Sequence, residues 1–453
     1  MSTISGIANI ALSALNTYAA AISVTSTNIA NSETTGYTRR QAVIEASGTG
    51  GVDVTEVKRI YDSFATNQLL SANTDLGKWE AEQETISSVE GVFSDTEDYG
   101  LSSAMSDFWD AWNDVANDAS DSTARSVLAS AADTLANTFN SMSSDLSNIQ
   151  NDIDNRVVET LNSINELTAQ IADTNQKISK AAAAGTDTNT LKDTLDSLVL
   201  ELSELVDINT SADSAGQVSI QLADGKILVE GTKTWSLSTT TNSTTGLQDI
   251  TWVSESGSET VITDDITSGK LGGYLEVRDE LIPSYREQLD ELAASIIDHI
   301  NALQTSGYDL NGDAGVSFFT GGSAADMAVN SAITDDPSLI AAAATANGVP
   351  DDGSNATASA ELQNSLLFNS STATYSDYYA ALVSKVGATV DSINTYYSSQ
   401  SDTVELYQNQ RDSVSSVSLD EETTKLLLYQ SAYSASAKVM SYLDEMLQTL
   451  IEM

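Results

Sequence analysis

The 453-residue chain contains no cysteine and a single histidine. Without cysteine there can be no disulfide bond, thiolate metal site or nucleophilic thiol. With one histidine, the usual zinc and haem sites and histidine-based catalytic triads are all but excluded. The histidine, His299, occupies a seam position in a predicted helix, where we expect a packed or partly buried side chain rather than a ligand.

Basic residues are scarce, because 19 lysines and arginines stand against 65 aspartates and glutamates, a formal net charge of −46. Such a charge repels nucleic-acid phosphates and anionic lipid surfaces, so we expect neither nucleic-acid binding nor membrane insertion. The acidity indicates a solvated outer surface more simply than a saline habitat.

Long apolar runs and a basic N-terminus are also missing. No run approaches the roughly 20 apolar residues of a membrane span. Nothing before Arg39 is positively charged, so the start of the chain lacks the basic region of a cleaved signal peptide. If the protein leaves the cell, we expect another route of export.

Residues 2–31 carry a stripe of mostly apolar side chains at alternating steps of four and three, the spacing of one face of a helix about 45 Å long. The opposite face carries Ser, Asn, Thr and Ala, where a free-standing surface helix carries Lys and Glu. We therefore expect both faces to be covered only in an assembly. The stripe comprises Ile4, Ala8, Ala11, Leu15, Tyr18, Ile22, Thr25 and Ile29.

The C-terminus repeats this spacing. Ser418, with Glu421 and Glu422 behind it, is typical of a helix N-cap with acids on the first turn. The two stripes can pair with each other, with copies of themselves, or both, and the plainer alternative is a helical core in which the two ends meet. The second stripe comprises Leu426, Tyr429, Tyr433, Ser436, Met440, Leu443, Leu447 and Leu450.

The whole pattern predicts a mainly α fold: an elongated antiparallel bundle with coiled-coil helices at both termini and a small inserted β-rich domain. Asp224-Gly225 lies between alternating strands and predicts a hairpin, and Pro283 should start or kink its helix. The expected divisions are a terminal helix with its turn and strand at 1–59, bundle at 60–210, 269–307 and 359–417, one outer domain built from β-rich 211–268 and loop-rich 308–358, and a C-terminal helix at 418–453.

No catalytic, cofactor or metal site stands out. Asp309, Asn311 and Asp313 resemble a calcium loop, but Ala314 and Thr320 replace its glycine and bidentate glutamate, so we expect a turn-rich loop. Among 65 acids, carboxylate pairs arise by chance and a glycosidase-like pair cannot be picked out. We expect no cofactor and no enzymatic activity.

The stretch NIANSETTGYTRRQ, residues 28–41, closes the first predicted helix and resembles the N-terminal signature of the flagellar rod, hook and hook-associated axial proteins. Its GYTRRQ ending is most similar to the members that join hook to filament. Three further stretches are similar to the same family: DFWDAWNDVANDASDSTAR, GKLGGYLEVRDELIPSYREQLDELA and SLDEETTKLLLYQSAYSASAKVM. The motif residues are Asn28, Asn31, Gly36, Tyr37, Arg39 and Arg40.

The resemblance implies a structural protein of the bacterial flagellum that joins hook to filament and assembles as a homo-oligomer through its terminal helices. It further implies an extracellular location, reached by flagellar type III export without a cleaved signal, contacts with the hook protein and a second junction protein, and an export chaperone at the C-terminal region. The rivals are a rod or hook subunit, which should lack the helix of Trp109 and Trp112, and a carboxylate-based cell-wall hydrolase.

Within the motif, we expect the two asparagines to help end the helix, Gly36 to supply a turn and Tyr37 to anchor the following strand. The two arginines should hold the turn near the negative end of the helix dipole. The plainer alternative is an ordinary capped helix with solvated arginines. If the two stripes form the contacts between subunits, Leu443→Glu should leave the bundle folded and block incorporation.

Overall fold

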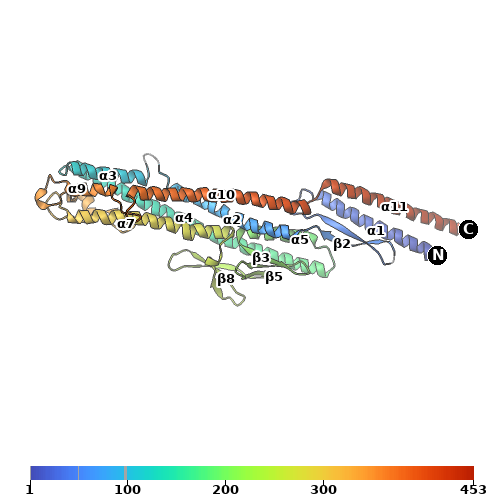
Figure 1. The fold of residues 1–453 in the computed structure, drawn as a ribbon. Coiled ribbons are helices and arrows are strands. Elements are labelled where there is room, and N and C mark those ends of the chain that lie inside the picture. The colour runs from blue at the N-terminus through green and yellow to red at the C-terminus, as the bar shows by residue number, and fades with distance from the viewer. Residues whose placement is uncertain (1, 49, 96–98, 453) are drawn as a thin grey trace.

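The chain folds into a long, mainly helical rod with both termini at one end, and a β-rich insert lies against one side (Figure 1). The computed structural model describes residues 2–48, 50–95 and 99–452, with the side chains of residues 2, 3 and 450 set aside. This architecture confirms the predicted fold class.

Long helices make up most of the rod. Side-chain caps begin several of them: Asp62 accepts from Phe64 and Ala65 N–H groups, and Thr374 forms a capping box with Asp377. The helices are α1 Ser2–Ala30, α2 Ser63–Val92, α3 Leu101–Asn117, α4 Ser122–Ala183, α5 Asn189–Leu205, α6 Gly269–Leu275, α7 Ile282–Ser306, α8 Ser331–Asp335, α9 Ser354–Glu361, α10 Tyr375–Ser415 and α11 Leu419–Glu452.

The bundle core lies between α2, α3, α4, α7 and α10. The 62-residue helix α4 buries one apolar face along most of its length, from Leu128 to Ile178, because its apolar positions recur at helical spacing. At the far end of the rod the core is aromatic, where Phe108 and Trp112 of α3 pack on Phe318 at ring-centroid distances of 6.3 and 5.4 Å.

A π-helical turn, Glu276–Leu281, joins α6 to α7 just before Pro283. Proline has no N–H to continue the helical ladder, and this explains why the wider turn lies directly before it. The side-chain amide of Gln150 in α4 donates to the Arg278 carbonyl oxygen at 2.7 Å, and so pairs a carbonyl of the turn. Pro283 therefore lies at the start of α7, as predicted.

The β-rich insert consists of two small antiparallel sheets. Gly225 has a φ of +88° in the predicted hairpin turn, and Ile220 lies opposite Val229. Asn165 and Asn175 of α4 bond the backbone of Leu237 and Val218, so asparagines of the bundle hold both sheets. The strands are β3 Ile208–Ala212, β4 Val218–Leu222, β5 Ile227–Glu230 and β6 Lys233–Thr234 in one sheet, and β7 Leu237–Thr241, β8 Gln248–Val253 and β9 Glu259–Val261 in the other.

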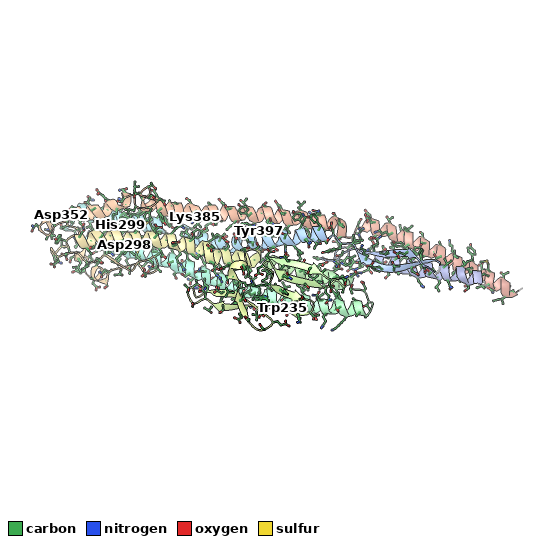
Figure 2. The ribbon with its side chains drawn as sticks, turned by 60° about the horizontal axis from the view of Figure 1, so that its bottom comes forward. Trp235, Asp298, His299, Asp352, Lys385 and Tyr397 are labelled. Carbon is green, nitrogen blue, oxygen red and sulfur yellow. The ribbon has the colours of Figure 1, made fainter. Side chains whose placement is uncertain are left out.

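The second interruption, residues 308–358, does not join this insert, so the prediction of one outer domain built from both segments is wrong. It contains the short pair β10 Phe319–Thr320 and β11 Ala328–Val329, which packs on α4 and α7. Figure 2 shows Asp352 at the far end of the rod, well away from Trp235 of the insert. The cause is burial, since Phe318 and Phe319 close the aromatic end of the core.

An additional hairpin follows α1. Strand β1, Arg40–Ala46, pairs antiparallel with β2, Val52–Arg59, and both lie alongside α1. The sequence analysis predicted only a turn and a strand here. The hairpin sits between the terminal helices and the rest of the rod, and it positions the motif residues.

Candidate functional site

The terminal arm, residues 2–61 and 416–452, projects from one end of the body, residues 62–415 (Figure 1). In the arm α1 and α11 lie side by side and run in opposite directions, with the end of α1 beside the start of α11. The rings of Tyr18 and Tyr429 pack against each other across this pair in a tilted arrangement, with centroids 6.4 Å apart. The two predicted stripes thus meet within one chain, which was one of the alternatives left open.

The buried face of α1 is displaced by about one position from the predicted stripe. Of the eight predicted positions only Ala11 and Thr25 are fully buried. The other fully buried side chains of α1 are Thr17, Ala21 and Asn28, which lie beside the stripe. Thr17 donates to the Val52 carbonyl oxygen of the hairpin at 2.6 Å. Small side chains are buried here because the hairpin backbone approaches the helix closely, and the larger Ile4, Ala8, Leu15, Tyr18, Ile22 and Ile29 are half-buried.

In α11 only Leu443 of the predicted stripe is fully buried, at 2% exposure. Leu426, Tyr429, Ser436 and Met440 are half-buried, Tyr433 and Leu447 are exposed, and the side chain of Leu450 lies outside the described residues. Because Leu443 is covered within its own chain, a charge there should disturb the α1–α11 pair itself. The bundle core does not include Leu443, so the expectation that Leu443→Glu leaves the bundle folded stays a prediction, now joined by a loss of stability in the arm.

The stretch Ile4–Ala30 is long and apolar enough to cross a membrane by length and composition alone, contrary to the expectation that no segment approaches a span. Alanine and isoleucine raise the mean hydropathy of this stretch, although serine, threonine and asparagine interrupt every apolar run. Core helices of globular proteins and signal sequences share this length and composition. In the structure its Thr17, Thr25 and Asn28 side chains are buried against protein.

The arm exposes more large apolar side chains than the body does, although it is much smaller. It is also nearly neutral: residues 1–61 and 416–453 hold ten acidic and six basic residues, against 55 and 13 in residues 62–415. An exposed apolar surface of this extent marks an interaction site. The exposed set is Ile7, Ile10, Leu12, Tyr61, Leu419, Leu427, Leu428, Tyr433, Val439, Tyr442, Met446, Leu447 and Ile451.

Asn28 is the centre of the motif and is fully buried. Its side-chain amide donates to the Arg40 carbonyl oxygen and to Glu422 Oε2, both at 2.8 Å. Its Oδ1 accepts from the Tyr37 hydroxyl at 2.8 Å and from the Arg40 N–H at 3.0 Å. All donors and acceptors of this amide are satisfied, so one side chain joins the end of α1, the hairpin and the start of α11.

The turn after α1 follows the expected chemistry in part. Asn31 bonds back to the Thr27 carbonyl oxygen at 2.8 Å, which helps end the helix. Gly36 has a φ of +78°, and a Cβ there would lie 2.7 Å from Ser197 Oγ of α5, so the turn requires glycine. Tyr37 anchors the turn to Asn28, and burial raises the pKa of the Tyr37 hydroxyl.

The arginines are paired with carboxylates of other elements rather than with the helix dipole. Arg39 pairs with Glu421 of α11 at 2.7 Å, and its N–H donates to the Ser415 carbonyl oxygen of α10 at 2.8 Å. Arg40 lies over the Tyr37 ring and pairs with Asp193 of α5. The alternative of solvated arginines is therefore wrong.

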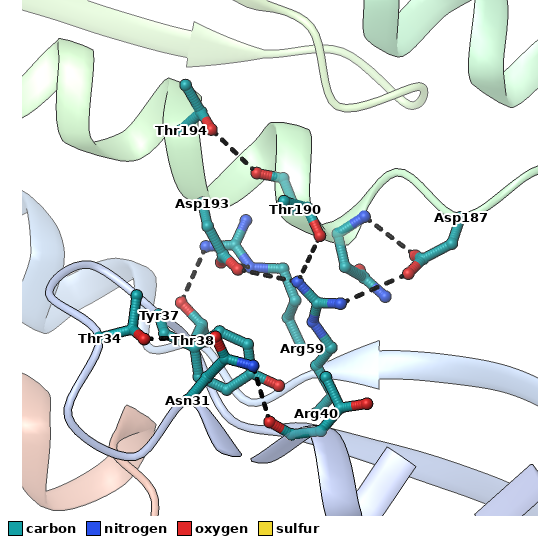
Figure 3. Close-up of polar contacts among 12 residues, drawn as sticks. Asn31, Thr34, Tyr37, Thr38, Arg40, Arg59, Asp187, Thr190, Asp193 and Thr194 are labelled. Atoms are coloured by element: carbon teal, nitrogen blue, oxygen red, sulfur yellow. Dashed lines mark hydrogen bonds and ion pairs between the residues drawn. The ribbon is translucent and has the colours of Figure 1, made fainter. Parts of the chain in front are cut away.

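Five residues that the sequence analysis missed lie beside the motif: Arg59, Asp187, Thr190, Asp193 and Asp196. With Arg39, Arg40 and the motif turn they form what we call the neck, and Figure 3 shows Arg40, Arg59, Asp187, Thr190 and Asp193 of this set. Arg59 Nε lies 2.9 Å from Asp193 Oδ1, and Arg59 also pairs with Asp196. Burial raises the pKa of the Asp196 carboxyl, and the Arg59 charge opposes this. Glu422, assigned only to the helix dipole, is the buried acceptor of Asn28. Recognising the hairpin would have placed Arg59 beside Arg40.

The remaining candidate residues have structural roles. His299 is half-buried near the far end of the rod (Figure 2), with Nδ1 2.7 Å from the Ser295 carbonyl oxygen of its own helix. Asp309 Oδ1 accepts the N–H groups of Asn311 and Asp313, both at 2.9 Å, as in a tight turn. Within residues 2–48, 50–95 and 99–452 no group of side chains could hold a metal ion.

Comparisons with known proteins match different families to the ends and to the middle of the chain. The family model described as the flagellar hook-associated protein FlgK helical domain matches residues 86–319. The models for the flagella basal body rod protein and for the C-terminal part of the rod proteins FlgEFG match residues 9–38 and 408–453. The shared axial segments thus fall mainly on the terminal arm, with residues 408–415 in α10, and the FlgK helical domain lies within the body.

Relatives that align over nearly their whole length point to the same family. Flagellar hook-associated protein 1 of Bacillus subtilis is 29% identical over 97% of this chain and 96% of its own length, and that of Escherichia coli is 26% identical over 99% of both. The solved flagellar hook junction protein FlgK from Burkholderia pseudomallei superposes with a TM-score of 0.70 at 18% identity, over 77% of this chain and 100% of its own, and so shares the fold.

An elongated helical body that carries a paired terminal arm with the shared rod-protein segments defines an axial protein of the bacterial flagellum. The chain belongs to the family of the flagellar hook-associated protein FlgK. It is a structural component of the junction between hook and filament, outside the cell, and the rod or hook subunit alternative is set aside.

Proposed function

We propose that the exposed apolar face of the terminal arm, defined above from Ile7 to Ile451, makes the contacts between neighbouring subunits in the flagellar axis. The observation that carries this is the combination of exposed apolar side chains with near neutrality, in a chain whose body is strongly acidic. Acidic bodies repel one another when packed closely, whereas neutral apolar arms do not. The hook protein and the second junction protein are the proposed neighbours along the axis.

We also propose that α11 is covered by an export chaperone before assembly. Its exposed Leu427, Leu428, Tyr442 and Ile451 would otherwise favour aggregation of the free subunit. Export without a cleaved signal is consistent with the N-terminal helix α1, which carries no charged side chain and so lacks the basic region of a signal peptide. Neither membrane insertion nor catalysis forms part of the proposed role, and a cell-wall lysis assay on the purified protein tests the second point.

Single charges on the exposed face test the assembly proposal. Leu427→Glu and Tyr442→Glu replace side chains that are 59% and 64% exposed, so the stability of the free subunit should change by no more than about 0.5 kcal/mol. Incorporation at the junction, scored by motility and by immunolabelling, should be lost. Val261→Glu, on the β-rich insert at 55% exposure, is the matched control and should assemble normally.

Leu443→Glu separates folding from assembly. It places a charge where the side chain is 2% exposed, so it should destabilise the α1–α11 pair by at least about 2 kcal/mol before any contact between subunits is made.

Normal junction assembly by both Leu427→Glu and Tyr442→Glu would show that the exposed apolar face of the arm is not the interface between subunits.

A further inference from the structure

The arm is joined to the body without a shared apolar core. The continuous core of the body runs from Ala81 to Ile393, and among the residues described it includes none from the arm. Ala11, Ala21 and Leu443 are buried within the arm itself. What crosses between the two is a set of hydrogen bonds and ion pairs, together with the two chain connections at residues 60–62 and 416–418.

The central contact of this set is one carboxylate that takes two arginines. Arg40 and Arg59 are direct partners in the register of the β1–β2 hairpin, and like charges placed opposite each other destabilise a strand pair. Asp193 of α5 compensates both, with Oδ2 3.2 Å from Arg40 Nη2 and Oδ1 2.9 Å from Arg59 Nε. The hairpin therefore carries a paired positive charge that needs a carboxylate from the body.

These three side chains are only 10–11% exposed, and their pairing is therefore less screened by water and salt than a surface ion pair. Further polar contacts surround them. Arg40 donates to Thr190 Oγ1 at 2.8 Å (Figure 3), and Asn189 donates to the Val57 carbonyl oxygen at 2.8 Å. Arg39 bonds the last residues of α10, close to the chain connection at 416–418.

Open space lies on both sides of this contact. A groove of about 620 Å³ is lined by the turn at Gly36 and Tyr37, by α2 and α5, and by the end of α10, although the turn approaches Ser197 of α5 closely at Gly36. A second groove of about 590 Å³ lies between the end of α1, β2 and the loop between α4 and α5. Where side chains do not interlock, dispersion contacts do not fix the relative orientation of two parts.

We propose that Asp193, with Arg40 and Arg59, forms a latch that fixes the arm to the body, and that release of the latch lets the arm turn as a unit about residues 60–62 and 416–418. The α1–α11 pair and its hairpin stay together in this motion, because Asn28, Leu443 and the Tyr18–Tyr429 contact lie wholly within the arm. The inference does not depend on how the arm meets neighbouring subunits.

Distance measurements between spin labels test the latch. Because the chain contains no cysteine, Ala19→Cys on α1 and Ser401→Cys on α10, both exposed, provide a uniquely labelled pair across the neck. Double electron–electron resonance should give a narrow distance distribution in the otherwise unchanged chain. In Asp193→Asn the width of the distribution should at least double, and Arg40→Gln combined with Arg59→Gln should do the same.

The control is Asp173→Asn, the same chemical change at an exposed ion pair with Lys177 on α4, which should leave the distribution narrow. A second label pair within the arm, Ala19→Cys with Ser434→Cys, should stay narrow in Asp193→Asn. If Asp193→Asn is as narrow across the neck as its control, the latch does not exist. If the pair within the arm broadens as well, the arm unfolds rather than turning, and the proposal is equally overturned.

Discussion

At the scale of single residues, buried polar side chains fix how the helices and the hairpin of the arm pair with one another. Asn28 has no spare hydrogen-bonding capacity, since its amide meets the hairpin, Tyr37 and Glu422 at once. An aspartate in its place would present a second carboxylate to Glu422, and a serine could not reach the same partners. The asparagine of the motif is thus explained by the contacts of this particular amide, which helix-capping rules alone do not reveal.

Glu82 of α2 makes the stability of the body depend on pH. Burial raises the pKa of the Glu82 carboxyl from 4.5 to about 7, nearby Glu276 adds to this, and Lys78, 3.7 Å away, opposes it. The folded state therefore holds the proton more tightly than the unfolded chain does. The contribution of this carboxyl to stability is present below about pH 4.5 and is lost as pH rises towards 7.

Glu82→Gln, an isostere of the protonated acid, should therefore gain stability relative to the unchanged chain by up to about 3 kcal/mol between pH 5 and pH 8. Urea unfolding of both chains at the two pH values measures this difference. An unchanged difference between pH 5 and pH 8 would show that Glu82 is already ionised in the folded state at the lower pH.

At the scale of elements, periodicity predicted the helices but not what covers them. The terminal stripes placed Leu443 and Tyr18 on an apolar face, and only the structure shows that these faces meet in one chain. The buried face of α1 shifted towards Ala21 and Asn28 because a hairpin, unpredicted, lies on it. The segment 308–358 was misassigned because its weak periodicity hid two aromatic residues, Phe318 and Phe319, that complete the core.

Two helical glycines show how closely elements approach in the body. A Cβ on Gly273 of α6 would overlap the Lys78 carbonyl oxygen of α2, whereas a Cβ on Gly387 of α10 would meet nothing within 4 Å. Gly273→Ala should therefore destabilise the body by about 1–3 kcal/mol through overpacking. Gly387→Ala should stabilise it by about 0.5–1 kcal/mol, because alanine is the better helix former.

Thermal unfolding followed by circular dichroism compares the two glycine variants directly. Both are the same chemical change in a helix, so opposite signs isolate the effect of the close contact between α2 and α6. Equal stabilities for the two variants would contradict the packing argument.

At the scale of the whole molecule, the arm and the body should unfold as separate units. They share no continuous apolar core among the described residues, and cooperativity follows shared burial. In the free subunit, backbone amides of residues 4–30 and 419–449 should exchange with deuterium faster than those of 135–178 in α4. Equal protection of the two regions would show that the polar neck couples them fully.

Because α4 is long, a small rotation at the neck causes a large displacement at the far end of the rod. This helix begins at the far end of the rod and ends beside Asp187, so its 62 residues span about 90 Å between the ion pairs and the aromatic tip. Over a distance of about 90 Å, a rotation of the body by about 5° relative to the arm displaces the aromatic tip by about 8 Å. Contacts of a few ångströms around Asp193 thus set the position of a surface that lies most of a subunit length away.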